Sequence, residues 1–141
     1  MESSDLKKIV AVDERTAEKD FDRWLETINS TPRVIREAEK VQKVDIIDAI
    51  CSGLITVDDD GVMKLKLSEP LTGQRPIDML TFKSRFTVQD IRKAVKRIEP
   101  GDNYGMLMAH ASVLIGIEVQ VIGQFGRPDF NRISSIVSYF L

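Results

Sequence analysis

The pattern of hydrophobic and polar positions divides the chain into helix-like ends and a strand-like middle. Near the start, one apolar stripe lies at the spacing i, i+3, i+4 and i+7, and its members are Phe21, Trp24, Leu25 and Ile28. This spacing predicts an amphipathic helix that begins near Thr16. The residues before it, 6–14, alternate only partly and predict either a short strand or an ordered arm.

A second helix is predicted from Pro32 to about Cys51, because Thr31 can cap it and proline suits the first helical position. Its apolar stripe changes phase once along the helix and comprises Val34, Ile35, Ala38, Val41, Ile46, Ile47 and Ile50. Both helices precede Gly53. Residues 1–52 are therefore expected to form an N-terminal helical extension.

The middle of the chain predicts a small antiparallel sheet. A hairpin is expected over about 54–67, since two β-type runs flank Asp60-Gly61, a dipeptide that tolerates the positive φ of a tight turn. An edge strand is expected over about 77–84. Pro70 and Pro76 are expected to stop strand extension on both sides of an exposed turn, since proline donates no backbone hydrogen bond.

Three more helices are predicted in the last third of the chain. Thr87 and Asp90 fit a capping box at the start of a helix over 88–98, and Pro100-Gly101 ends it. A long helix over 103–122 is apolar on several sides, and a final helix opens at Pro128.

Together these elements predict an α+β fold that is mostly helical, with about five helices packed on the small sheet. At 141 residues the chain suits one compact unit, in which residues 53–141 form the core that follows the helical extension.

Charge distribution and cysteine content bear on where the protein is located, but they do not identify a functional site. Residues 1–80 hold 17 acidic and 12 basic side chains, whereas residues 81–141 hold 5 and 8. With a single cysteine, Cys51, and no secretory signal pattern at the N-terminus, a cytoplasmic location is expected. Residues 104–123 are long enough for a membrane span, but Glu118 would be costly at its centre, so we expect a buried helix and no membrane partner.

Catalytic and cofactor motifs are weak in this sequence. His110 is the only histidine and lies on an apolar stripe, so a nucleophile that needs a histidine partner is poorly supported, as is a metal site. A calcium-loop interpretation of Asp58, Asp60 and Gly61 puts Leu67, which has no ligand atom, at the twelfth position. We therefore expect a protein that is not an enzyme and that uses no cofactor.

Two surfaces are candidates for binding other molecules. The first is a subunit or client contact formed by the long helix and the C-terminal stripe, with Val113, Ile117, Val121, Ile133, Ile136, Val137, Tyr139, Phe140 and Leu141 as its members. The second is a basic face made of Lys83, Arg85, Arg92, Lys93, Lys96 and Arg97. The basic face can be solvated, can meet an acidic protein surface, or can bind nucleic acid, which we regard as the less favoured partner because no docking motif accompanies it.

The order of motifs over residues 62–141 resembles the tail assembly chaperones of long-tailed bacteriophages, particularly those of Mu-like prophages. The first group of matching positions is Leu67, Pro70, Leu71, Gly73, Ile77, Leu80, Lys83, Thr87 and Asp90. The second group is Gly116, Asp129, Ile133, Ile136, Val137, Phe140 and Leu141. The chain departs from the family at Phe86, where the family tends to have proline, and its first half has no matching segment.

The resemblance implies an assembly factor in the host cytoplasm that coats the long helical tape measure protein and later gives way to tail tube subunits. It also implies a second, longer product made by ribosomal frameshifting. A homo-oligomer would let many copies cover one long client by avidity. The alternatives are a small regulator that binds nucleic acid through residues 83–97 and a structural component that stays in the tail.

Overall fold

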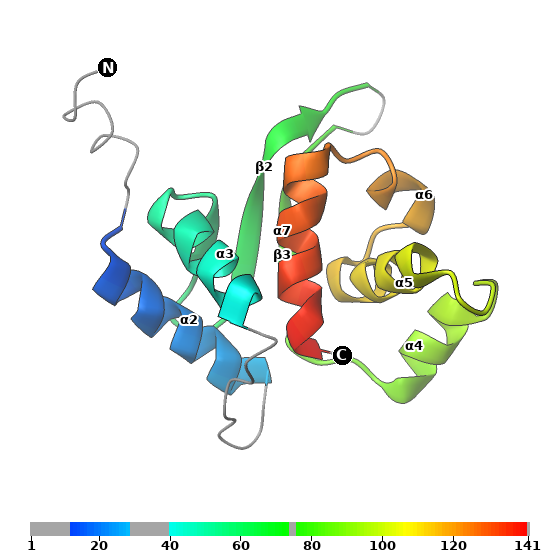
Figure 1. Cartoon of the computed structure of the whole chain (residues 1–141), viewed down its shortest axis with the longest axis horizontal. Helices are drawn as coiled ribbons and strands as arrows, with labels where there is room; N and C mark the ends of the chain where they lie inside the picture. The colour runs from blue at the N-terminus through cyan, green and yellow to red at the C-terminus, as the bar shows by residue number, and fades with distance from the viewer. Residues whose placement is uncertain (1–11, 29–39, 74–75, 141) are drawn as a thin grey trace.

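The computed structural model describes residues 12–28, 40–73 and 76–140. Six α-helices, one 3-10 helix and three strands lie in these residues, and the fold is α+β as the sequence predicts. The N-terminal helices α2 and α3 lie on one side of the central helix α7, and α4, α5 and α6 lie on the other (Figure 1). The elements are α2 (Glu14–Ile28), α3 (Lys40–Cys51), β1 (Ile55–Val57), β2 (Met63–Leu71), β3 (Ile77–Phe82), α4 (Val88–Val95), α5 (Asn103–Ile115), α6 (Val119–Ile122), α7 (Arg127–Val137) and η2 (Ser138–Phe140).

The sheet is antiparallel in the order β1-β2-β3, so β3 is an edge strand as predicted. Alternate side chains of β2 are buried and exposed, and the buried ones are Met63, Leu65 and Leu67. Leu80 and Phe82 of β3 lie opposite Leu65 and Met63 and extend the same buried face. The period of two therefore gives the sheet one face toward the core and one toward solvent.

The core joins the N-terminal helices to the C-terminal helix. Phe21 and Trp24 of α2 and Tyr139 of η2 have ring centroids 5.5–5.8 Å apart in tilted and edge-to-face arrangements. The predicted stripe on α2 is thus confirmed, and Ile46, Ile47 and Ile50 of α3 are buried in the same cluster. Aromatic pairs of this kind add about 0.5–1.5 kcal/mol to what area burial alone contributes.

The β1–β2 hairpin is attached to α2 at its turn. The Arg23 guanidinium donates to the carbonyls of Val57 and Asp58 at 2.8 and 2.9 Å. Gly61 has φ +80°, and a Cβ at this position would collide with the Thr27 side chain. The glycine is required both for its left-handed backbone and for the close approach of α2.

The long helix predicted over 103–122 is interrupted, and this prediction is wrong. Gly116 adopts a left-handed conformation with φ 79° and ends α5 by donating its N–H to the Ser112 carbonyl. The chain then turns before α6 starts, and Glu118 is an exposed N-cap residue of α6 rather than a carboxylate inside an apolar helix. A glycine with positive φ is a common way for a helix to end.

The prediction that Pro70 stops strand extension is also wrong, because β2 continues to Leu71. β1 pairs with β2 only at residues 63–65, so Pro70 lies where no β1 residue needs its missing N–H. The pairing of β2 with β3 shifts register between Lys66 and Leu71.

One predicted core position, Val41, is exposed, and several other predicted positions lie outside the described residues. Val41 was assigned to the apolar stripe of the second helix, but its side chain is 68% exposed on α3. The predicted features outside the described residues are residues 6–11 of the predicted arm or strand, the helix start at Thr31 and Pro32, and the positions Val34, Ile35, Ala38 and Leu141.

Candidate partner-binding surface

The structure separates the residues of the predicted subunit or client contact into two groups. Ile133, Ile136 and Val137 are fully buried and Tyr139 is 3% exposed, all within the core of a single chain. Phe140 is half-buried between Trp24 and Phe86, with ring centroids 5.9 and 5.8 Å away. The C-terminal stripe is therefore used to fold the chain, and its buried members do not present a surface to a partner.

The remaining members of that contact lie around the break between α5 and α6. Val113, Ile117 and Val121 are half-buried, and Ile117 and Val121 pack against the core from outside. The Ser112 hydroxyl donates to the Ile117 carbonyl and closes the turn between the two helices. These side chains keep some exposure, but they form no continuous stripe because the helix ends at Gly116.

A depression of about 470 Å³ opens between the start of α5, α6 and the start of α7. Its wall presents polar and apolar surface in about equal parts and is formed by Tyr104, Met108, Ile122, Gly123, Phe125, Phe130, Asn131 and Arg127. Tyr104 is 73% exposed, and its ring lies 6.3 Å from that of Phe130 at an interplanar angle of 31°. A Cβ at Gly123 would lie 3.3 Å from Met108 Cε, so the glycine leaves room for the Met108 side chain in the depression.

The chemistry of this depression suits an apolar side chain with a polar or acidic neighbour. Methionine and aromatic residues adapt to irregular apolar partners. Arg127 is exposed at the rim and can meet a carboxylate. We call this feature, with Tyr104, Met108, Phe130 and Arg127 as its principal residues, the α5–α7 depression.

The six residues of the predicted basic face are all exposed, but they do not form one patch. Lys83 follows β3, its N–H donates to the Leu114 carbonyl at 2.8 Å, and its ammonium lies near Gly116 at the end of α5. A cation at this place complements the negative end of the helix dipole. Arg85 lines a separate small depression with Phe86 and Phe140. Only Arg92, Lys93, Lys96 and Arg97 share one face, on and just after α4.

The capping box predicted at the start of α4 is confirmed. The Asp90 N–H donates to Thr87 Oγ1 at 3.1 Å, and the Thr87 N–H donates to the Asp90 carboxylate at 2.9 Å. These hydrogen bonds from Thr87, with Lys83 and Lys93 nearby, hold the pKa of Asp90 below its ordinary value of 3.8. A fixed negative charge therefore starts α4, where the helix dipole favours it.

Neither His110 nor Cys51 has the surroundings of a catalytic residue. His110 Nδ1 donates to the Met106 carbonyl one turn earlier at 2.8 Å. Burial, followed by the charge of Asp48, raises the pKa of the Cys51 thiol. A thiol with a raised pKa holds little thiolate and is a poor nucleophile at neutral pH.

Neither a metal site nor a membrane-spanning helix is found in the described part of the chain. Among residues 12–28, 40–73 and 76–140, no group of three or more His, Cys, Asp or Glu side chains could hold a metal ion. Within the same residues, no helix combines the length and the apolar character that crossing a bilayer requires.

Three comparisons, with protein-family models, with curated proteins and with solved structures, find no match to this chain.

Sequence reasoning missed the α5–α7 depression, although its signals were present. Met108 lies in the predicted long helix, and Phe130 lies in the predicted last helix. Tyr104 lies at the start of α5. The depression forms because α6 folds back at Gly116, and an uninterrupted helix would have carried Ile122 and Gly123 away from Phe130.

Proposed function

We propose that this protein is a non-enzymatic assembly chaperone for a long helical client, of the kind that keeps the tape measure protein of a phage tail soluble. The observation that carries the proposal is the α5–α7 depression, which Tyr104, 73% exposed, lines together with Met108 and Phe130. A depression that presents tyrosine, methionine and phenylalanine side chains beside an arginine is typical of a protein interaction site.

Binding would follow the helix-in-groove mode. A client helix with apolar residues at i, i+3 or i+4 would place one of them in the depression and another against Tyr104. Arg127 at the rim would select a client that carries a carboxylate beside the apolar anchor. The pocket takes few side chains, so one contact is weak and the client is held by many copies along its length.

The resemblance to tail assembly chaperones supports the same class of function, and most of the resembling positions have structural roles in the fold. Leu67, Leu80 and Ile133 are core residues, and Asp129 connects α7 to β2. Thr87 and Asp90 start α4, and Gly116 ends α5. The resembling positions thus specify how this part of the chain folds, while the contact with a client is proposed from the exposed residues.

The experiment that tests the function is co-expression with the long helical protein of the same tail gene cluster, followed by affinity purification and light scattering. We expect the client to be soluble only with this chain and the complex to hold many copies of it. Failure of the two proteins to associate would contradict the proposal. Recovery of this chain in finished tails would instead identify a structural component.

Nucleic-acid binding is a second candidate because Arg92, Lys93, Lys96 and Arg97 share one exposed face. Phosphate contacts from four cations would give affinity that falls steeply with salt and that depends little on sequence. Fluorescence anisotropy with a labelled duplex and a labelled single strand, measured over a range of salt concentrations, distinguishes this candidate. Binding with that salt dependence, in a chain that fails to hold the helical client, would favour the regulator.

A further inference from the structure

One end of the molecule carries a basic helix face that has no partner in the described structure. Residues 83–97 hold six basic side chains and one acidic side chain. On α4, none of the residues is buried, and the helix packs on α5 through its apolar side only. Within the described ranges, no carboxylate lies within ion-pair distance of Arg92, Lys93, Lys96 or Arg97. We call these four residues the basic end.

The opposite end of the molecule is acidic. Residues 12–28 and 58–60, which form α2 with its start and the hairpin turn, hold nine acidic and three basic side chains. Arg23 joins these two segments, and its charge is already engaged by Asp20 at 3.0 Å. The acidic end is defined by the exposed carboxylates of Asp22, Glu26, Asp58, Asp59 and Asp60.

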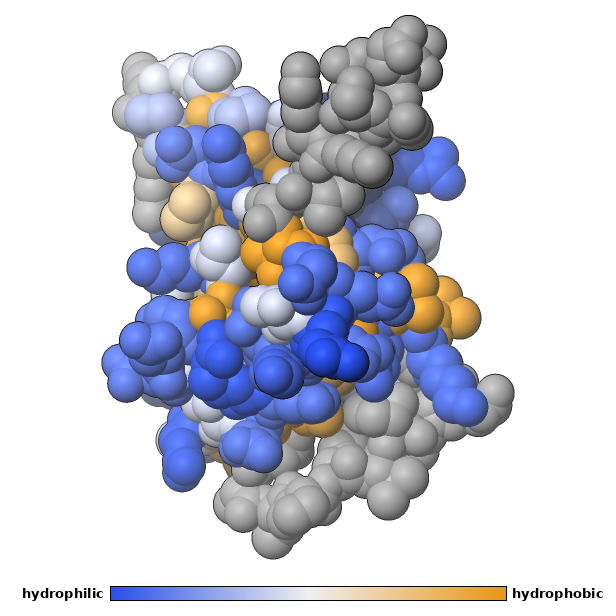
Figure 2. Space-filling view, turned by 90° about the vertical axis from the view of Figure 1, so that its left-hand side faces the viewer, coloured by the Kyte–Doolittle hydropathy of each residue, from blue (hydrophilic) through white to orange (hydrophobic). Residues whose placement is uncertain are grey.

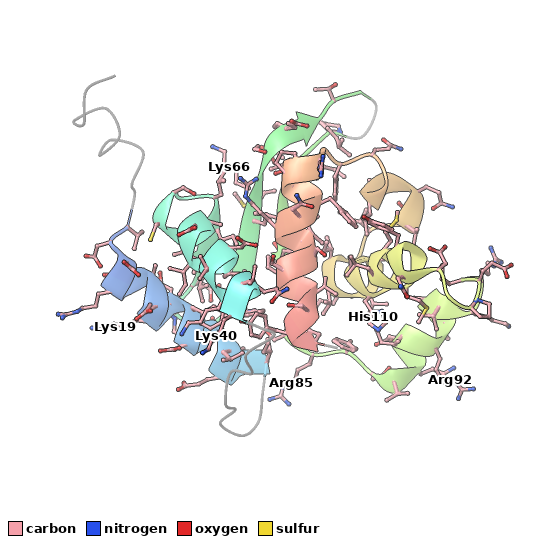
Figure 3. All side chains as sticks on the ribbon, viewed as in Figure 1. Lys19, Lys40, Lys66, Arg85, Arg92 and His110 are labelled. Atoms are coloured by element: carbon pink, nitrogen blue, oxygen red, sulfur yellow. The ribbon has the colours of Figure 1, made fainter. Side chains whose placement is uncertain are left out.

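These two ends cannot neutralise each other within one copy. α2 lies at one side of the molecule and α4 at the other, with α7 between them (Figure 1). The side chains confirm this separation, since Arg92 points outward at the far end from Lys19 of α2 (Figure 3). Seen from the α2 side, the surface is predominantly hydrophilic, as a charged contact requires (Figure 2).

We infer that copies of this chain associate head to tail, with the basic end of one copy against the acidic end of the next. A second copy is the occupant that the charges favour, because it supplies the complementary end at equal concentration. The formal net charge is only −2, so long-range repulsion between copies is small. The contact is heterologous, and repeating it gives an open row or a ring rather than a symmetric dimer.

This inference stands independently of the proposed function, since it requires no client. It also differs from the subunit contact that the sequence suggested, whose members Ile133, Ile136, Val137 and Tyr139 are in the core. A contact formed by exposed charges is weak and sensitive to salt, because the Debye length falls from about 30 Å at 0.01 M to about 3 Å at 1 M ionic strength.

The first test is sedimentation velocity of the unmodified purified chain at low and high salt, over a range of protein concentrations. We expect species larger than one copy that grow with concentration at about 0.01 M salt and a monomer at about 1 M. A monomer under both conditions would overturn the inference. Association that is equally strong at high salt would overturn it as well, because an apolar contact would then be responsible.

The second test uses two charge-reversed variants that cannot associate alone. One carries Arg92→Glu, Lys93→Glu, Lys96→Glu and Arg97→Glu, and the other carries Asp22→Lys, Glu26→Lys, Asp59→Lys and Asp60→Lys. Asp58 is left unchanged because its carboxylate accepts the N–H groups of Asp60 and Val62 in the turn. We expect each variant to be monomeric by itself and the equimolar mixture to associate.

The matched control reverses two exposed lysines of the open sheet face, Lys64→Glu and Lys66→Glu, and is expected to associate like the unmodified chain. Association of either reversed variant alone would contradict a head-to-tail contact. A mixture that stays monomeric, while circular dichroism shows both variants folded, would contradict it too. If the basic end served nucleic acid instead, the unmodified chain would be monomeric and would retain nucleic acid through purification.

Discussion

Asp129 shows how one residue can determine the position of a helix. Its carboxylate is fully buried and accepts the N–H and hydroxyl of Ser68 at 2.8 and 3.0 Å and the N–H of Glu69 at 3.0 Å. Arg132, one turn later on α7, donates to the same carboxylate at 3.3 Å. The carboxylate accepts backbone N–H groups of β2 at residues that β1 does not reach. It therefore attaches the start of α7 to the sheet.

Replacing this carboxylate should therefore destabilise the whole chain. We expect Asp129→Ala to lower the free energy of unfolding by about 3 kcal/mol, because the backbone N–H groups of Ser68 and Glu69 lose a fully buried acceptor. Chemical denaturation followed by circular dichroism measures this loss. Asn131→Ala, at an exposed position of the same helix, is the control and should change the stability by less than about 0.5 kcal/mol.

A second residue-scale prediction concerns acid sensitivity of α4. The folded pKa of Asp90 is held below 3.8, so its stabilising contribution is present above that pH and is lost as the pH falls through the folded pKa. We expect Asp90→Asn to increase the amide exchange rate of α4 at pH 7, and the difference from the unmodified chain to be smaller at pH 3 than at pH 7. Hydrogen exchange at both pH values measures this.

The matched variant for that experiment is Asp59→Asn, which removes an exposed carboxylate of the hairpin turn and should leave α4 exchange unchanged at both pH values. Equal protection of α4 in the Asp90→Asn variant and the unmodified chain at pH 7 would show that the capping box contributes little.

At the scale of elements, periodicity predicted most helices and strands correctly. The stripe of Phe21, Trp24 and Leu25 located α2 because its apolar side chains have only one place to be buried. The hairpin and the capping box of α4 were equally predictable, since both depend on local hydrogen bonds and turn geometry. The long helix was mispredicted because its composition is apolar on both sides of Gly116, so no change in pattern marked the break.

The break also explains why the site was not predicted. Sequence spacing assigns residues to faces of one helix, and it cannot show that α6 returns toward α7. Burial of Ile133 and Ile136 likewise depends on packing between segments far apart in the chain. An apolar stripe identifies residues that will be covered, but it does not show whether the cover is the same chain or a partner.

Replacing Gly116 by alanine should change the stability in opposite directions for an uninterrupted helix and for a helix that ends at Gly116. In an uninterrupted helix, Gly116→Ala would stabilise the chain by about 0.5–1 kcal/mol. With φ at 79°, alanine must adopt a left-handed conformation, so we expect a loss of about 1–2 kcal/mol. Denaturant titration decides the sign, and Gln120→Ala, at an exposed position in α6, serves as the control.

At the scale of the whole molecule, the described residues form a core, the α5–α7 depression and two oppositely charged ends. Ile133, Ile136, Val137 and Tyr139 of the predicted contact lie in the core, and we propose the α5–α7 depression as the site for a client. Head-to-tail association through the charged ends would leave the depression of every copy available. A row of copies could then hold a long helical client by many weak contacts.

The measurement that tests this account most directly is recovery of the helical client with a Tyr104→Glu variant. Tyr104 is exposed and lies in the first turn of α5, where a carboxylate is compatible with the helix dipole, so the variant should fold normally. Val41→Glu, which changes an exposed apolar residue on α3, is the matched control. All three chains are co-expressed with the client at equal levels, and the client that co-purifies is quantified.

We expect Tyr104→Glu to reduce the recovered client by about tenfold or more and Val41→Glu to leave recovery unchanged. Client recovery with folded Tyr104→Glu equal to that with the unmodified chain would contradict a binding site at the α5–α7 depression.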